Sequence, residues 1–191
     1  MTLRLAEHSR RFGSQGLGIV VTFPDPLMAI SIEPLTPGRI LAAKHVIRTV
    51  WREHFGQHPN AFVRTFLDTD TALQDLAEAE ATYFQNGGVV LVIVADGEIV
   101  GTGAVLRIDT ELCELKRMFL IREYRGRGLG QQLAEELLRF ARVQGYRRIR
   151  LGSNAELTAS HALYRKLGFK PIPAYEPGGD KYAYYMEREL S

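Results

Sequence analysis

Hydrophobic positions along the chain follow two different spacings, and together these spacings predict a mixed α/β domain. Apolar residues recur at helical intervals over residues 40–55 and again on one face of residues 129–141. Residues 89–95 form a continuous apolar run, which is typical of a strand buried on both faces. Asp96-Gly97 follows this run and predicts a two-residue hairpin turn into a second strand. We therefore expect helices packed on a central sheet.

The same signals place the remaining elements and complete the order β-α-α-β-β-β-α-β-α-β-β. Further strands are predicted at residues 29–33, 98–108, 111–121, 147–153, 169–172 and 182–190. Two more helices are predicted, one over residues 71–84 capped by Asp70 or Thr69 and one over residues 159–167 capped by Thr158. Glycines stand where helices should end, at Gly87, Gly145 and Gly168. The predicted fold class is α/β, with a central mixed sheet flanked by helices.

Composition and charge narrow the class of protein. The chain has 191 residues, of which 46% are apolar and 24% are charged, as in a folded globular domain. A formal net charge of +2 argues against a domain built around nucleic acid. No apolar run approaches the roughly 20 residues that span a bilayer. We expect neither a nucleic-acid nor a membrane partner, and one domain at residues 29–191 behind an N-terminal extension at residues 1–28.

Cysteine and histidine content bears on redox and metal chemistry. Cys113 is the single cysteine, so neither an intramolecular disulfide nor a cysteine-rich metal site is expected. The five histidines show no spacing typical of metal ligands, and we expect no metal. The N-terminal segment lacks a clear small-residue cleavage site, which makes a signal peptide a poor interpretation. We expect a cytoplasmic protein.

The strongest chemical signal is the run RGRGLG at residues 125–130, between a predicted strand and a predicted helix. Glycines let the backbone approach a ligand, and the amides at a helix start point outward toward an anion. A pyrophosphate fits this arrangement, and Arg125 and Arg127 would add charge-assisted hydrogen bonds. Dinucleotide folds and P-loops use similar turns, but the run contains neither G-x-G-x-x-G nor a Gly-Lys-Ser/Thr ending. An Arg-Gly contact with nucleic acid and a plain solvated turn are the alternatives.

A second segment, ALYRKLGF at residues 162–169, combines with the loop into a family resemblance. The GNAT acetyltransferase superfamily has the acyl-CoA motif Arg/Gln-x-x-Gly-x-Gly/Ala, matched here by Arg125, Gly128 and Gly130. The family's later motif, Ala-Leu-Tyr-x-x-x-Gly-Phe, is matched by Ala162, Leu163, Tyr164, Gly168 and Phe169. The chain resembles GNAT N-acetyltransferases from about residue 30 to its end, and most specifically over residues 114–169.

The resemblance implies the GNAT acyl-CoA N-acyltransferase fold and an enzyme that moves an acetyl group from acetyl-CoA directly to a primary amine. In this family the strand before the loop carries a bulge and diverges from its parallel neighbour, which leaves space for the pantetheine arm. The Leu120 amide would then polarise the thioester carbonyl. The residues assigned to acetyl-CoA are Met118, Phe119, Leu120, Arg125, Gly126, Arg127, Gly128, Leu129, Gly130, Gln131 and Asn154.

Two side chains are candidates for the proton transfers of this reaction. Tyr164 would give a proton to the departing sulfur, because an unperturbed tyrosine is protonated at neutral pH. A tyrosine packed between helix and sheet is the alternative. Glu114 would act as general base on the incoming ammonium, and a glutamate paired with Lys116 is the alternative. Asn154 would contact the pantetheine amide or cap a turn.

Other positions bear on these assignments. The family often has asparagine where this chain has Leu157, and some members have glutamate where it has Gly152, which leaves Glu114 as the main base candidate. Cys113 has no histidine paired with it in a visible motif, and direct transfer needs no nucleophile. His161 precedes the tyrosine of its helix by three residues, and we expect it at the surface.

The acceptor is expected to be a small amine or an amino-acid-like molecule. A protein lysine or N-terminus is one alternative, and a non-catalytic acyl-CoA-binding regulatory module is another. In this fold the first two helices and the final strands shape the acceptor side, which in this chain corresponds to about residues 51–66 and 175–185. The aromatic and polar residues there include Trp51, His54, Phe55, His58, Tyr175, Glu176, Asp180, Lys181, Tyr182 and Tyr184. The resemblance also implies a homodimer, with residues 182–190 as the candidate interface strand.

Overall fold

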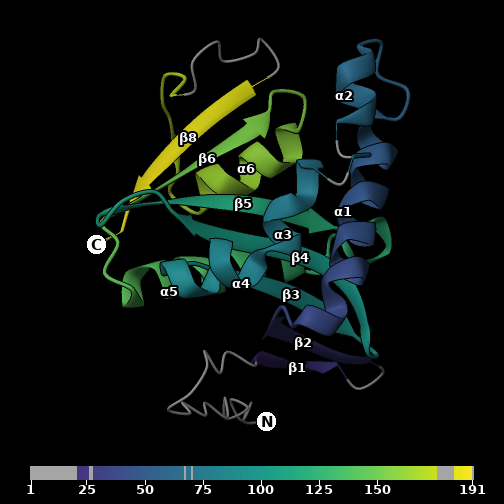
Figure 1. Cartoon of the computed structure of the whole chain (residues 1–191), viewed down its shortest axis with the longest axis horizontal. Helices are drawn as coiled ribbons and strands as arrows, with labels where there is room; N and C mark the ends of the chain where they lie inside the picture. The colour runs from purple at the N-terminus through teal and green to yellow at the C-terminus, as the bar shows by residue number, and fades with distance from the viewer. Residues whose placement is uncertain (1–20, 26–27, 67, 70, 176–182, 191) are drawn as a thin grey trace, which may run out of the picture. The chain divides into compact units, whose positions relative to one another are not determined.

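The computed structural model describes residues 21–25, 28–66, 68–69, 71–175 and 183–190, and it confirms a mixed α/β fold (Figure 1). The described residues form two compact units. Unit 1 takes its described residues from Met1–Ala77, Leu91–Thr102 and Phe119–Leu129, and unit 2 takes them from Glu78–Val90, Gly103–Met118 and Gly130–Ser191.

The strands of the described chain are β1 (Val21–Asp25), β2 (Met28–Pro34), β3 (Val89–Ala95), β4 (Glu98–Arg107), β5 (Leu112–Leu120), β6 (Arg148–Asn154), β7 (Lys170–Pro171) and β8 (Ala183–Glu189). Their order in the sheet is β1-β2-β3-β4-β5-β6-β8-β7. The α-helices are α1 (Ile40–Phe55), α2 (Ala61–Thr65), α3 (Gln74–Ala77), α4 (Ala79–Thr82), α5 (Leu129–Val143) and α6 (Thr158–Lys166). Short 3-10 helices are η1 (Pro37–Arg39), η2 (Thr71–Leu73), η3 (Phe84–Asn86) and η4 (Arg122–Tyr124).

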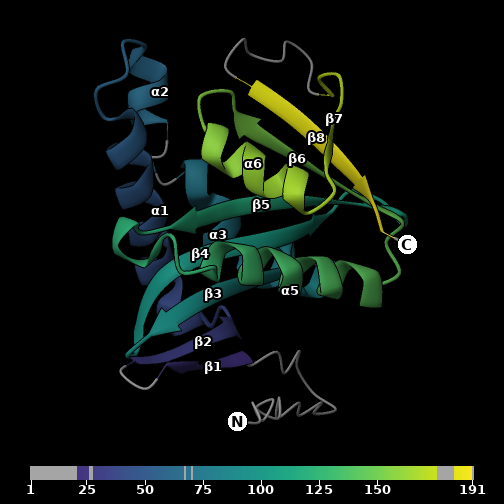
Figure 2. The ribbon, with the colours of Figure 1, turned by 180° about the vertical axis from the view of Figure 1, so that it is seen from behind.

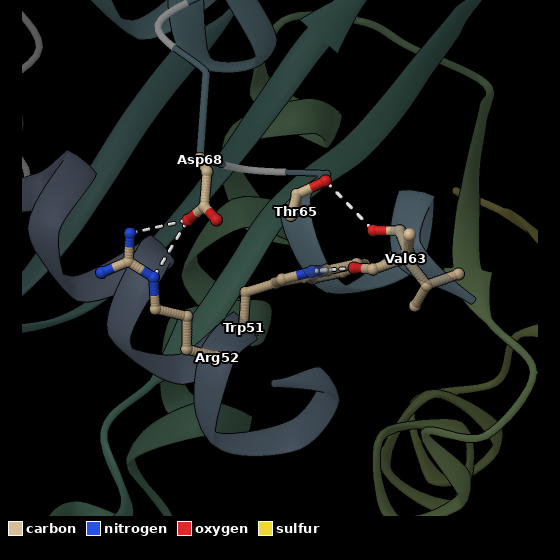
Figure 3. A network of polar contacts seen from close by, with 6 residues as sticks. Trp51, Arg52, Val63, Thr65 and Asp68 are labelled. Carbon is tan, nitrogen blue, oxygen red and sulfur yellow. Dashed lines mark hydrogen bonds and ion pairs between the residues drawn. The ribbon is translucent and has the colours of Figure 1, made fainter. Parts of the chain in front are cut away.

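Helix α1 organises unit 1. Its buried apolar side chains are Ala43, Val46, Ile47 and Val50, which lie on one face, and Phe55 at its last position. Trp51 Nε1 donates to Val63 O at 2.7 Å, and Arg52 donates from Nη2 and Nε to Asp68 Oδ1 at 2.7 and 2.9 Å (Figure 3). These contacts hold α2 and Asp68 beside α1. Asp96 and Gly97 have φ angles of 48° and 89°, which confirms the predicted hairpin turn between β3 and β4.

In unit 2, helices α5 and α6 lie on the same face of β5 and β6. Figure 2 shows both helices in front of those strands. The buried side chains of α5 are Leu129, Leu133, Ala134, Leu137, Leu138, Phe140 and Ala141, spaced as an amphipathic helix requires. Gly145 and Gly168 have φ angles of 86° and 85° and end α5 and α6, as predicted. Strand β6 pairs antiparallel with β8 along its whole length.

The predicted helix over residues 71–84 is wrong as a continuous element. The chain there forms η2, α3, α4 and η3 instead. Buried residues recur at Leu73, Leu76 and Ala79, a spacing that also fits one α-helix and so does not reveal the breaks. Thr69 Oγ1 accepts from Ala72 N at 3.3 Å and caps the start, whereas the other cap candidate, Asp70, lies outside the described residues.

Further differences concern the ends of elements. Thr158 is the first residue of α6 and not its cap, because the N-cap position falls on Leu157, which makes no capping hydrogen bond through its side chain. Sequence periodicity also missed α2, which Asn60 caps by accepting from Phe62 N at 2.9 Å. Strand β1 falls within the predicted extension and pairs antiparallel with β2, whereas residues 1–20 lie outside the described part.

Within the described residues, no helix is long and apolar enough to cross a membrane.

Candidate active site

Strands β5 and β6 begin as a parallel pair and then separate. Their register joins Leu112–Glu114 to Arg148–Arg150 and stops there, although both strands continue. Further along β5, Arg117 has a φ angle of 56°, a left-handed conformation that a non-glycine residue seldom adopts. A strand residue of this kind is typical of a β-bulge, which bends the strand and releases backbone groups from the ladder. Beyond Glu114, β6 therefore leaves backbone groups of β5 available to an extended ligand.

The loop after β5 is a turn with two glycines in the left-handed conformation. Gly126 and Gly128 have φ angles of 76° and 80°, whereas Arg125 is extended. Successive N–H groups of such a turn can face one bound anion, and we call this segment the nest. Helix α5 begins at Leu129, so its unpaired first-turn amides and the positive end of its dipole extend the nest. A Cβ added at Gly126 would meet no atom within 4 Å, so the space over this backbone is open.

The Arg125 side chain anchors the loop. Its Nη1 and Nη2 donate to the two carboxylate oxygens of Glu53 on α1 at 3.1 and 2.8 Å, and its Nε donates to Leu120 O at 2.9 Å. A two-point arginine–carboxylate pair fixes orientation as well as position. The guanidinium has five N–H groups, and these three hydrogen bonds use three of them. The hydrogen bond from Arg125 to a phosphate stays a prediction.

The neighbouring loop side chains are also held by the protein. The Arg127 guanidinium carbon lies 5.3 Å from the centroid of the Tyr124 ring. Gln131 accepts from Lys166 Nζ and donates to Glu135 Oε1, both at 2.8 Å. The backbone amides of Gly130 and Gln131 lie in the first turn of α5 and are further candidates to meet an anion at the loop.

The strand residues assigned to acetyl-CoA are half-buried, and glycines of β4 make space for them. In unit 2, a Cβ added at Gly103 would come within 2.7 Å of Met118 Sδ. In unit 1, a Cβ added at Gly101 would come within 3.0 Å of Leu120 Cδ1 and 3.2 Å of Phe119 O. Larger residues at these two positions would displace β5 or its side chains.

Glu114 is a buried carboxylate with two cationic neighbours. Its side chain is 9% exposed, Lys116 Nζ lies 3.4 Å from its Oε1, and Arg150 Nε donates to its Oε2 at 3.3 Å. The ion pair with Lys116 that the sequence offered as an alternative is present, and a second one with Arg150 accompanies it. The carboxylate is thus fixed where β5 and β6 separate.

Tyr164 lies in α6 with its ring edge-to-face against Phe169, at a centroid distance of 5.8 Å. Burial raises the pKa of its hydroxyl well above the usual range. Within the part of the chain that the structure describes, this hydroxyl makes no hydrogen bond. It is therefore protonated at physiological pH and has its proton available for a bound molecule.

The sequence matches a model of the Acetyltransferase (GNAT) family over residues 46–169. The chain belongs to the GNAT acetyltransferase family. Among curated relatives, the N-acetylaspartate synthetase of Danio rerio is 36% identical over 106 residues, which are 54% of this GNAT chain and 38% of the synthetase. The IAA acetyltransferase of Azospirillum brasilense is 33% identical over 141 residues, 69% of this chain and 92% of that protein. The chain thus spans less than half the length of that synthetase.

Solved GNAT structures share the fold. A GNAT-family acetyltransferase of Staphylococcus aureus superposes with a TM-score of 0.72 at 22% identity, over 85% of this chain and 100% of that one. The PaiA N-acetyltransferase of Thermoplasma acidophilum, solved in complex with coenzyme A, gives a TM-score of 0.68 at 20% identity, over 84% and 98% of the two chains. At these identities the likeness establishes the GNAT fold alone.

Asn154 and His161 contact each other in this GNAT domain. Asn154 Oδ1 accepts from Glu156 N at 2.9 Å, which is the turn-capping role that the sequence left as an alternative. His161 is 4% exposed, stacks on Tyr184 at 4.2 Å and donates from Nε2 to Asn154 O at 3.1 Å. The prediction that His161 lies at the surface is therefore wrong. One turn of helix places it against the last strand, a contact that sequence spacing does not reveal.

Replacing His161 by glutamine is expected to make the free energy of unfolding depend less steeply on pH in the acid range. Burial lowers the pKa of His161, so the folded protein resists a proton that the unfolded chain accepts below about pH 6.5. This stabilising contribution is present above that pH and is lost as the pH falls. Between pH 7 and 5 the unfolding free energy of the wild type should fall more steeply, by up to about 1.4 kcal/mol per pH unit. Urea titrations measure the slopes, with the exposed His45→Gln as control; equal slopes in wild type and H161Q would contradict the assignment.

Cys113 is buried, and burial raises the pKa of its thiol to about 12. The reactive thiolate is therefore scarce at neutral pH, which disfavours a nucleophilic role. Among the described residues no cluster of histidine, cysteine and carboxylate side chains is arranged to hold a metal ion.

The acceptor-side residues fall into separate clusters. In unit 1, Trp51 packs on Phe55 at a centroid distance of 4.5 Å. In unit 2, Tyr175 packs on Tyr185 at 4.6 Å. The predicted acceptor residues Glu176, Asp180, Lys181 and Tyr182 lie outside the described residues.

Sequence reasoning missed two side chains that support the site. Glu53 anchors Arg125 from 72 residues away, and Arg150 binds Glu114 from 36 residues away. A usable signal existed for Arg150, because it stands between the apolar Ile149 and Leu151 of a predicted strand. A charged residue on the outward face of an interior strand calls for a partner on the neighbouring strand.

Proposed function

We propose that this GNAT protein is an acetyl-CoA-dependent N-acetyltransferase that acts by direct transfer to a primary amine of a small, amino-acid-like acceptor. The main evidence is the nest of Gly126 and Gly128 at the start of α5. This nest follows β5, a strand that separates from its parallel partner β6. Coenzyme A was bound in the similar PaiA enzyme, and a relative is named for making N-acetylaspartate, an N-acetylated amino acid. These names support the donor and the acceptor class.

The donor would be held mainly by backbone groups. The amides from Gly126 to Gln131 would receive the pyrophosphate, with the dipole of α5 adding positive potential. Backbone groups of Met118, Phe119 and Leu120 would pair with the pantetheine arm, and the Leu120 amide would donate to the thioester oxygen. The side-chain nitrogen of Asn154 would contact the same arm, since its oxygen caps a turn. The Arg125–Glu53 pair keeps the loop in the required conformation.

The reaction needs three proton movements. An ammonium first loses a proton to Glu114, directly or through water, and the neutral nitrogen attacks the thioester carbonyl carbon. The carbon–sulfur bond breaks as Tyr164 gives its proton to the sulfur. The second proton of the nitrogen returns through water to the tyrosine oxygen, so one amide, one thiol and one proton on Glu114 result.

Replacing Glu114 by glutamine tests the base. Turnover should fall about 10-fold to 100-fold at pH 7, and the loss should be larger at pH 6 than at pH 9, because more of the amine is already neutral at high pH. The measurement is kcat against pH for the wild type and E114Q. A loss of the same size at every pH would show that Glu114 instead positions Lys116 and Arg150.

The function itself is tested by thiol release from acetyl-CoA in the presence of amines. The panel contains free amino acids, simple amines, and peptides that carry either a free N-terminus or a lysine. Acetylation of small amines supports the proposal. Acetylation of peptides alone redirects it to a protein acceptor, and acetyl-CoA binding without acetylation of any acceptor redirects it to a regulatory module.

Assembly and location are further proposals. We propose a homodimer, as the family resemblance implies, and a cytoplasmic location, because the N-terminal segment is a poor match to a signal peptide. Strand β8 pairs with β6 along its whole length, and with β7 only at Met186 and Glu187, so most of its second edge is not used by β7. Light scattering of the purified protein would show the mass of a single chain if the dimer proposal is wrong.

A further inference from the structure

Arg150 is a half-buried cation that the reaction described above does not use. It lies on β6 between the buried Ile149 and Leu151, and its side chain is 21% exposed. In the parallel register it stands opposite Glu114, in the last pair before β5 and β6 separate. Arg150 is therefore next to the candidate base, at the place where the sheet opens.

Two contacts fix the plane of the Arg150 guanidinium. Its Nε donates to Glu114 Oε2 at 3.3 Å, and its central carbon lies 3.7 Å from the centroid of the Tyr175 ring. Tyr175 is itself packed at 64° against the ring of Tyr185. An arginine held at one edge and one face has already lost much of its rotamer freedom, so binding through its remaining edge costs less entropy.

The remaining edge of this guanidinium carries its terminal nitrogens. Within the described part of the chain, Nη1 and Nη2 of Arg150 make no hydrogen bond, because its contact with Glu114 runs through Nε. By contrast, the terminal nitrogens of Arg125 both bind Glu53, and Arg148 Nη1 lies 3.5 Å from Glu187 Oε1. Two parallel N–H groups on a fixed plane match the two oxygens of a carboxylate.

Local charge favours an anion at this place. Lys116, Arg150 and Glu114 together carry two positive charges and one negative charge, a net of +1, with both cations within 3.4 Å of the carboxylate. Such a group attracts a carboxylate and disfavours a polycation. The outward position that follows on β6 is Gly152, where a Cβ would lie 3.3 Å from Tyr175 Oη and from Tyr185 Cε1. A side chain there would press on the ring that orients Arg150.

We propose that the terminal nitrogens of Arg150 bind a carboxylate of the acceptor, and that the acceptor is therefore an amine that carries a carboxylate, such as a free amino acid. This inference rests on the proposed function and names its substrate class. An amino acid has its ammonium and its carboxylate on one carbon, and the chain offers a carboxylate and a guanidinium as direct neighbours. Glu114 would face the ammonium while Arg150 holds the carboxylate.

The test compares matched acceptors on matched variants. Each L-amino acid is assayed beside its α-amide, and aspartate and glutamate are also assayed beside asparagine and glutamine. The enzymes are wild type, R150Q, R150K and R148Q, the last altering an arginine on the same outward face of β6. Because each comparison uses one substrate on two enzymes, the basicity of its amine cancels.

For the best carboxylate-bearing acceptor, R150Q should raise KM about 10-fold to 100-fold, as expected for the loss of a charge-assisted contact. KM for the matched acceptor that lacks this carboxylate should change less than 3-fold, because that acceptor never used the contact. R150K keeps the positive charge but not the two parallel N–H groups, so its KM should lie between those of wild type and R150Q. R148Q should have the KM of the wild type. A purely structural role for Arg150 would raise both KM values together, which would overturn the inference.

A separate titration with acetyl-CoA distinguishes the two levels of the proposal. Absence of acetyl-CoA binding, or of thiol release with every amine and peptide, overturns the proposed function and the inference together. Acetyl-CoA binding with acetylation only of amines or peptides that carry no carboxylate at this position overturns the inference alone. Preference of the wild type for the carboxylate-bearing member of each pair, lost in R150Q, supports both.

Discussion

Replacing Gly126 by glutamate is expected to abolish the binding of acetyl-CoA, with affinity lowered at least about 100-fold. The new carboxylate would stand over the nest of backbone amides and repel the pyrophosphate, and the two groups would compete for the same donors. The left-handed φ of 76° adds strain of about 1–2 kcal/mol, so stability should fall by a similar amount. Calorimetric titration with acetyl-CoA measures the affinity, and urea unfolding measures the stability.

Gly145 provides a matched control for this change. It has a φ angle of 86°, and a Cβ there also meets no atom within 4 Å, but it lies at the other end of α5. G145E should therefore lose comparable stability, and somewhat more because a carboxylate is unfavourable at a helix C-terminus. It should still bind acetyl-CoA as the wild type does. Equal affinity of G126E and G145E for acetyl-CoA would show that the loop is not the phosphate site.

Replacing Tyr164 by phenylalanine should lower kcat about 100-fold or more while leaving the affinity for acetyl-CoA within about 3-fold. The ring would keep its packing on Phe169, and only the proton for the departing sulfur would be lost. Because burial raises the pKa of this hydroxyl, the tyrosine stays protonated as the pH rises to 9, and the wild type should show no alkaline loss of rate from this group. Single-turnover kinetics and acetyl-CoA titration separate chemistry from binding.

Tyr146 is the control for removing a buried hydroxyl. It lies in unit 2 and donates to Gly87 O at 2.8 Å. Y146F should cost about 1 kcal/mol of stability for the lost hydrogen bond and leave kcat unchanged. If Y164F turns over as fast as Y146F, Tyr164 serves packing alone.

The regular elements of this protein could be predicted because their hydrophobic signals are local. Helix α1 and strand β3 have the bounds that periodicity and the apolar run predict, and the glycine-rich loop lies between a strand and a helix as expected. The helix over residues 71–84 could not be predicted as broken, because each of its short pieces has apolar spacing that also fits one helix.

Much of the site depends on pairings between distant segments. Sequence reasoning named Glu114, but its partner Arg150 depends on the register of two strands that are joined through a helix. Arg125 was predicted to contact phosphate because it stands in the loop, and only the position of α1 shows that it also pairs with Glu53. The nest itself was predictable from composition, since glycine is the residue that adopts φ near +80° without strain.

The most direct test of the account is calorimetric titration of the purified protein with acetyl-CoA and, separately, with ATP and NAD. We expect one acetyl-CoA bound per chain and no comparable binding of ATP or NAD, because the loop offers backbone amides to a pyrophosphate and β5 offers backbone groups to an extended amide arm. Absence of acetyl-CoA binding, or binding of ATP with equal affinity, would contradict it.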